Sequence, residues 1–293
     1  MKAIKLASVF AVTAVAVAVS STTFAAEAVF SGEAGVEYVN YSNSKVAGAN
    51  NTNNNSADGT NLGEVELSVD TGVVYAEIEV QTDGVDEGTD INMEKLYVKQ
   101  GAVSFGRFDG SVSTGSFFGM DEIYGGVDLN TTSDTDNTGV RYKVTPELTV
   151  ALEATRSTAT EDSDVGVAVS YVQDFGAFKA GISGGSVGDA NSVNVGVQSV
   201  SGPATVSLNY GVGDKGATGA TDVEQMTASV AVAATEALTL TLEFSSDLEA
   251  ETSGTYFIGE YAMGDLTYYV KNYAGDLVGD ADERTIVGVK AFF

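Results

Sequence analysis

Three residue types that often carry chemistry are missing from this chain of 293 residues, which has no cysteine, no histidine and no tryptophan. Without cysteine there are neither disulfides nor thiol nucleophiles. Without histidine, every mechanism that needs an imidazole base is excluded, including the Ser-His and Asp-His arrangements of hydrolases. We therefore predict that the protein is not an enzyme and has no cofactor or resident metal.

Basic residues are scarce as well. The chain has 14 Lys and Arg against 41 Asp and Glu, a net charge of -27. Nucleic acid binding requires basic patches that meet phosphate, so nucleic acid is excluded as a partner. A chain this acidic is better suited to cations.

Long apolar runs are limited to one segment near the N-terminus. Residues 6–19 are apolar, with two lysines before them and small residues after them. This run is too short to span a membrane as a helix and has the pattern of a cleavable export signal. We predict a signal peptide at residues 1–25 and a single domain at residues 26–293.

Proline is also rare, with 2 residues, whereas glycine has 34. Apolar and polar residues alternate along many short segments, which predicts β-strands with one small apolar face and one face of Glu, Lys, Asn, Ser, Thr and Gly. A soluble β-sandwich also alternates, but it mixes larger residues on its inner face and carries more proline in its turns. The alternating segments include Val65–Val69, Val74–Val80, Leu148–Leu152, Val165–Val169, Val193–Val197, Val206–Tyr210, Leu238–Phe244 and Val287–Phe293.

Short and long connections alternate between these segments. This pattern predicts an all-β fold, a transmembrane antiparallel β-barrel of 16 strands with short periplasmic turns, long outer loops and both termini on the periplasmic side. The strand that ends at Phe293 is then expected to pair with residues 28–41 and close the sheet. The expected long connections are Ser42–Thr60, Asp83–Asp90, Phe108–Asn137, Arg156–Asp164, Gly184–Asn191, Gly213–Asp222, Asp247–Gly254 and Ala274–Glu283.

The longest connection, Phe108–Asn137, differs from the asparagine-rich first loop because it keeps apolar side chains, including Phe117 and Phe118. Such side chains favour burial, so we expect this third loop to fold back into the barrel lumen and narrow it. Its candidate constriction residues are Asp121, Glu122, Tyr124 and Asp128.

Strand alternation places several basic side chains on the polar, lumen face. Charges on the lipid face would be unfavourable at mid-depth, which supports this placement. Arg107 has the parity of the outward residues and joins the wall only if the strand ends or twists at Gly106. The predicted basic pore wall comprises Lys95, Lys99, Arg107, Arg141 and Lys143.

Four segments resemble the trimeric general porins of Gram-negative bacteria. Gly106–Asp109 is similar to the Gly-Arg motif that ends their fifth strand, and Glu122–Asp128 to the segment of their third loop that lies inside the pore. Asn137–Tyr142, followed by Thr145 and Pro146, resembles their sixth strand and the next turn. The terminal Phe293 resembles the signal that the barrel-assembly machinery reads.

This resemblance implies a homotrimer in the outer membrane of a Gram-negative bacterium, in contact with lipid and lipopolysaccharide. It also implies an eyelet in which acids of the loop face bases of the wall. The expected function is passive diffusion of ions and small hydrophilic solutes with a mild preference for cations. A substrate-specific porin, and a structural or adhesive barrel with ion-binding acidic loops, remain alternatives.

Overall fold

The computed structural model describes residues 27–41, 63–82, 89–120, 122–129, 136–154, 164–216, 222–278 and 283–293. Within these ranges the chain forms sixteen strands and one short 3-10 turn, η2 (Phe117–Gly119). The strands are β1 (Glu27–Tyr41), β2 (Gly63–Asp70), β3 (Val74–Thr82), β4 (Thr89–Gln100), β5 (Val103–Asp109), β6 (Asp136–Lys143), β7 (Leu148–Ala154), β8 (Val165–Asp174), β9 (Phe178–Val187), β10 (Ala190–Ser201), β11 (Ala204–Asp214), β12 (Asp222–Ala233), β13 (Leu238–Asp247), β14 (Thr252–Met263), β15 (Leu266–Ala274) and β16 (Arg284–Phe292).

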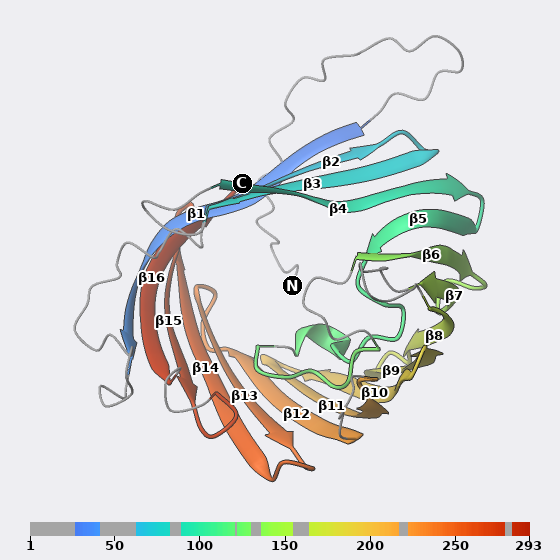
Figure 1. Cartoon of the computed structure of the whole chain (residues 1–293). Coiled ribbons are helices and arrows are strands. Elements are labelled where there is room, and N and C mark those ends of the chain that lie inside the picture. The colour runs from blue at the N-terminus through green and yellow to red at the C-terminus, as the bar shows by residue number, and fades with distance from the viewer. Residues whose placement is uncertain are drawn as a thin grey trace.

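The strands form one closed antiparallel barrel in which each strand pairs with its neighbours in the sequence (Figure 1). The first strand closes the ring. Residues Glu27–Glu33 of β1 pair with β2, and residues Glu33–Tyr41 pair with β16. Closure satisfies the backbone hydrogen bonds of both terminal strands, which is the condition for a sheet that crosses hydrocarbon. The prediction of a closed 16-stranded barrel is confirmed.

The strands expose apolar side chains and bury polar ones, which is the reverse of a soluble protein. On β10 the large apolar residues Val193, Val195 and Val197 are exposed, whereas Ser192 and Asn194 are buried toward the lumen. Exposed valine and leucine side chains recur at alternate positions around most of the barrel. An apolar exterior with a polar interior is stable only when lipid surrounds the barrel and water or polar groups fill it.

The periplasmic connections are tight turns. Glycines with positive φ occupy several of them, at Gly72, Gly101, Gly176, Gly202 and Gly264. Residues with a Cβ rarely adopt this backbone conformation, which explains why these turns use glycine.

Two outer connections are shorter than the sequence predicts. The one expected at Asp247–Gly254 comprises only residues 248–251, and the other lies between β9 and β10. A long loop is expected at Gly184–Asn191, but β9 continues to Val187 and β10 begins at Ala190. Glycine and serine suggest a loop, yet here they pair in register across the two strands. Only Gly188, with φ of 57°, and Asp189 remain as the turn.

Two apolar clusters lie inside the barrel. One comprises Val112, Leu129, Ala151, Ala168, Val187 and Ala190; the other comprises Val39, Tyr256, Tyr269, Tyr273 and Ile286. Val112 and Leu129 belong to the long β5–β6 connection, so the first cluster joins that connection to the wall.

Several predictions lie outside the described residues. Among them are the signal peptide at residues 1–25, the asparagine-rich loop, the second outer loop and nearly all of the loop expected at Arg156–Asp164. Among the residues that the structure describes, no helix has the length and hydropathy needed to cross a membrane.

Candidate pore constriction

The connection between β5 and β6 comprises residues 110–135 and is called the inner loop. Its described residues, 110–120 and 122–129, enter the barrel and lie along its inner wall (Figure 1). The prediction that the third loop folds into the lumen is therefore confirmed.

The inner loop is first fixed to β7. The carboxylate of Glu153 accepts hydrogen bonds from Ser111 Oγ at 2.5 Å and from the Val112 amide at 2.7 Å. Glu153 is only 2% exposed, and Arg141 lies 4.0 Å from it while donating to the Gly110 carbonyl. A buried carboxylate is stable when it is both paired and hydrogen-bonded, and this one has both kinds of partner.

Two asparagines of the wall hold the middle of the loop. The side-chain amide of Asn194 on β10 accepts from the Val127 amide at 2.7 Å and donates to the Val127 carbonyl at 2.8 Å. Asn209 on β11 donates to the carbonyls of Gly115 and Phe117 at 3.1 and 3.0 Å. The side-chain amide of asparagine has both a donor and an acceptor. It can therefore bind backbone N–H and C=O groups of a loop that has no neighbouring strand to pair with.

Serines of the wall add two further contacts. Ser183 Oγ donates to the Thr114 carbonyl at 2.6 Å, and Ser192 Oγ lies 2.8 Å from Ser113 Oγ. The neutral polar residues on the inner face of β9–β11 thus form a docking surface for the loop rather than a freely hydrated wall.

Glycines on the wall make room for the apolar side chains of the loop. Phe117 is buried, and a Cβ at Gly196 would lie 2.5 Å from its Cβ. A side chain at Gly181 would overlap the Phe117 ring, and one at Gly185 would lie 2.8 Å from Leu129. From the sequence, we interpret the glycines of Gly181–Gly188 as residues that let strands bend and approach one another closely. In the structure, Gly181 and Gly185 also leave room for the side chains of the inner loop.

The far end of the described loop reaches β12, β13 and β15. The hydroxyls of Thr227 and Ser245 donate to the Tyr124 carbonyl, the second at 3.3 Å. Tyr273 donates its hydroxyl to Glu122 Oε2 at 3.0 Å. The loop is therefore fastened from β7 around to β15, across about half of the barrel (Figure 1).

The predicted acidic residues have different positions. Asp121 lies outside the described residues. Glu122 is exposed and binds Tyr273, whereas Tyr124 is attached through its backbone. Asp128 is exposed and accepts a hydrogen bond from the Gly115 amide at 2.7 Å, which ties the two arms of the loop together.

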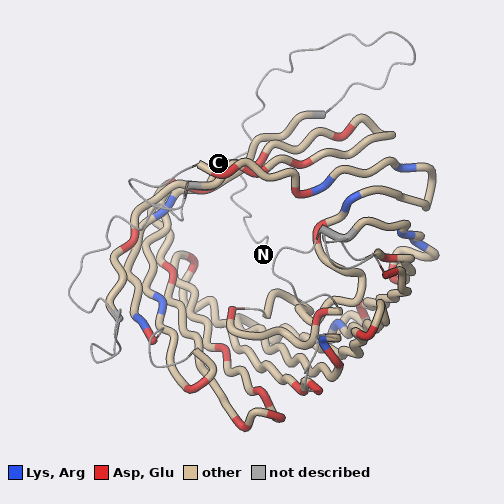
Figure 2. Tube along the Cα trace, in the orientation of Figure 1, with Lys and Arg blue, Asp and Glu red and all other residues tan. Residues whose placement is uncertain are grey.

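Several predicted basic residues pair with acids on the same wall. Lys95 forms a salt bridge with Glu77 and lies 3.5 Å from Asp109. Lys99 lies 2.5 Å from Asp70. The tube coloured by charge shows both blue and red positions in the part of the barrel formed by β3–β5 (Figure 2). Pairing of this kind reduces the positive field that these lysines project into the lumen.

The other predicted bases lie on β5 and β6. The Arg141 guanidinium lies 4.2 Å from the centre of the Phe108 ring, and Lys143 is exposed near the end of β6. Arg107 is half-buried and follows Gly106, which has an unusual φ of 144°. β5 nevertheless pairs through Gly106 and Arg107 without a register shift, and the place of Arg107 in the pore wall stays a prediction.

An aromatic stack on β3–β5 was not recognised from the sequence. Tyr75 stacks on Tyr97 with ring centres 5.1 Å apart, and Tyr97 stacks on Phe108 at 4.9 Å. Lys99 and Arg141 cover its two ends at 5.7 and 4.2 Å. The signal available was the position of Tyr75 and Tyr97 on the polar faces of adjacent strands, which register then pairs.

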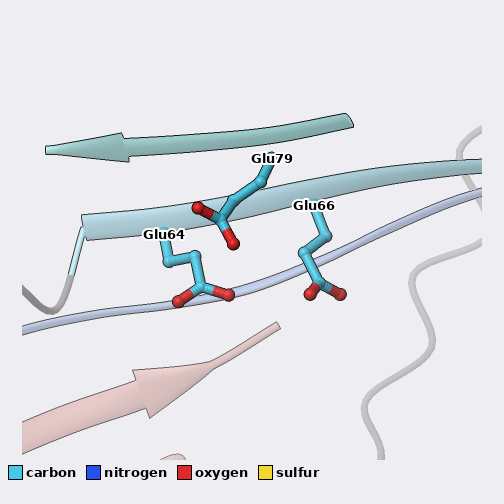
Figure 3. A group of neighbouring side chains, drawn as sticks. All are labelled: Glu64, Glu66 and Glu79. Carbon is cyan, nitrogen blue, oxygen red and sulfur yellow. The ribbon is translucent and has the colours of Figure 1, made fainter. Parts of the chain in front are cut away.

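Acidic side chains gather on β2 and β3. Glu64, Glu66 and Glu79 point toward one another, each with a carboxylate oxygen within 4.8 Å of the others (Figure 3). Ser31 donates a hydrogen bond to Glu66 at 3.3 Å. Alternation predicts that these glutamates face the lumen, but it does not predict their mutual approach.

The chain end completes the ring. The amide and carbonyl of Phe293 exchange hydrogen bonds of 3.0 Å with the carbonyl and amide of Gly32 on β1. The Phe293 side chain is 41% exposed. The last residue therefore extends the β1–β16 pairing by one rung, while its recognition by assembly machinery stays a prediction.

A closed barrel with an apolar exterior, a polar interior and an inner segment attached across half its circumference defines a transmembrane β-barrel with an internal loop. No protein-family model and no curated protein sequence matches the chain. Solved structures do match. A triple mutant of the porin of Rhodopseudomonas blastica is 18% identical, with a TM-score of 0.60 over 92% of this chain and 100% of that one. OmpT of Vibrio cholerae is 13% identical, with a TM-score of 0.58 over 93% and 99%. The fold of this chain is that of the porins.

Proposed function

We propose that this protein is an outer-membrane porin that lets ions and small hydrophilic solutes diffuse passively, with a mild preference for cations. The observation that carries the proposal is the inner loop: an ordered segment, docked on a polar wall, narrows the barrel lumen. A structural or adhesive barrel has no use for such a segment inside.

The cation preference rests on the distribution of charge. Lys95, Lys99 and Lys290 each lie within 2.8 Å of a carboxylate, so much of the positive charge is compensated at the wall. Glu64 and Glu66 of β2 and the acids of the inner loop contribute a negative field. Such a field concentrates cations at the constriction.

The ionic-strength dependence of the selectivity tests this origin. The Debye length is about 10 Å at 0.1 M salt and about 3 Å at 1 M, so a field from wall charges is screened as salt rises. We expect the ratio of potassium to chloride permeability, from reversal potentials in planar bilayers, to fall between these concentrations. A ratio independent of salt would point to selectivity by coordination instead.

Neutralising substitutions identify which acids matter. We expect Glu122→Gln with Asp128→Asn to lower the cation preference, because these exposed carboxylates lie on the inner loop. The matched comparison is Glu64→Gln with Glu66→Gln and Glu79→Gln on the wall. If the reversal potential of the loop variant equals that of the wild type, the loop acids do not form the selectivity site.

A substrate-specific porin would need aromatic faces that a solute can slide along. The stack of Tyr75, Tyr97 and Phe108 does not offer them, because its rings face one another and cations cover its ends. Saturable block of the current by a sugar or amino acid would nevertheless favour that alternative.

We further propose that the barrel assembles as a homotrimer, after removal of residues 1–25 and insertion by the barrel-assembly machinery. The likeness to porins supports this assembly. Chemical cross-linking of the unheated protein tests it: a ladder that ends at three subunits is expected, and a single band at the monomer mass would contradict it.

A further inference from the structure

A hollow lies in the outward face of the barrel over β6–β10. Its volume is about 700 Å³. Two rows of register-paired outward residues form it: Tyr142, Val150, Val169, Gly184 and Val193 in one row, and Val140, Leu152, Val167, Ser186 and Asn191 in the other.

Gly184 explains why the surface is hollow at this point. It lies between Val169 on β8 and Val193 on β10, whose side chains project outward. Gly184 has no side chain to fill the space between them. At the comparable outward glycine on β14, Gly259, the side chains of Leu240 and Val270 lie at 3.3 and 3.6 Å from a Cβ placed there, and Gly259 is buried. Gly184 has the Val193 side chain at 3.5 Å on one side and remains half-buried.

The hollow is apolar along most of its length and polar at one end. Valine, leucine and glycine line its body, whereas Ser186 and Asn191 lie at the end next to the turn at Gly188 and Asp189. That turn belongs to the outer side of the barrel. The polarity therefore matches an amphiphile whose polar part lies at the outer surface and whose chain points into the membrane.

We propose that this hollow seats an acyl chain of a phospholipid, with the polar ester linkage of that lipid beside Ser186 and Asn191. Hydrocarbon is the medium that surrounds this face, and an unfilled hollow would lose the dispersion contacts of its lining. A second copy of the chain fits less well. A stable protein interface uses roughly 20–30 residues a side, about two to three times what the two rows provide.

Substitution of Gly184 tests the proposal. Gly184→Phe fills the hollow, and Gly259→Phe is the matched control on a face that has none. Each purified barrel is incubated with phosphatidylethanolamine vesicles, with or without lipopolysaccharide, extracted in mild detergent, and examined by native mass spectrometry for retained lipid. Retention only from the vesicles that contain lipopolysaccharide would overturn the assignment to a phospholipid.

We expect the wild type and Gly259→Phe to retain a lipid, and Gly184→Phe to retain about one tenth as much. This factor is the one expected when about two buried methylene groups lose their contacts. Equal retention by Gly184→Phe and the wild type overturns the proposal. The proposal is also overturned if Gly184→Phe retains as much lipid as the wild type but no longer forms the oligomer. The hollow would then be a contact between subunits. Conductance should stay unchanged, so this test is independent of the channel function.

A second measurement avoids any substitution at the glycine. Because the chain has no tryptophan, Tyr142→Trp at the edge of the hollow and Tyr268→Trp on the outward face of β15 each introduce a single indole reporter. The barrels are reconstituted with a low fraction of phospholipid that is brominated in mid-chain. A lipid seated in the hollow should quench the fluorescence of the Tyr142→Trp variant more strongly than that of the Tyr268→Trp variant. Identical quenching of the two variants contradicts a seated lipid.

Discussion

Replacement of residues 110–135 by a short turn is expected to raise the single-channel conductance severalfold. The inner loop lies within the lumen and is the element that narrows it, so its removal leaves a channel bounded by the barrel wall alone. The barrel strands pair through backbone hydrogen bonds that do not involve the loop, and β5 and β6 remain neighbours. The measurement is the conductance step in planar bilayers.

The matched control shortens a connection outside the lumen, residues 248–251 between β13 and β14. This change should leave the conductance step as it is in the wild type. If the two shortened proteins have the same conductance as the wild type, the inner loop does not form the constriction.

The second large effect is expected from the wall asparagines. Asn194→Ala with Asn209→Ala removes the partners of the Val127 amide and carbonyl and of two loop carbonyls. Each buried backbone group left without a partner costs about 1–3 kcal/mol. The loop should therefore detach from β10 and β11. We expect larger noise in the open-channel current, and we expect a protease to cleave the loop at a lower temperature than in the wild type.

Gln198→Ala is the control for the asparagine variant. Gln198 is a wall amide on the same strand, β10, but its side chain donates to Ser207 of the wall and not to the loop. Its removal should leave the current noise unchanged. Equal noise in all three proteins would show that the asparagines do not hold the loop.

Much of the fold followed from the sequence because strand alternation is a local property. Segments such as Val193–Val197 indicate both their strand and its outward face. Closure follows because a sheet that crosses hydrocarbon cannot leave its edge strands unpaired. The prediction of a long loop at residues 184–191 was wrong. Glycine and serine favour turns, but they also occur in strands against which another segment packs closely. The sequence of the segment alone does not distinguish a turn from such a strand, whereas its pairing with a neighbouring strand does.

The site was predictable in part. The apolar side chains of the inner loop indicated burial, and Phe117 and Leu129 are buried. The docking partners were not predictable, because Asn194 and Asn209 lie 67 to 94 residues from the backbone groups that they bind. Alternation places a side chain in the lumen but does not state its partner, which is why the pairing of Lys95 with Glu77 also emerged only from the structure.

The central claim, that the barrel is a cation-leaning diffusion channel, is tested most directly by its reversal potential in a planar bilayer with a potassium chloride gradient. We expect discrete channel openings and a reversal potential with the sign of cation preference, reduced in the variant with Glu122→Gln and Asp128→Asn. A folded, heat-modifiable barrel that inserts but conducts no ions would contradict the claim.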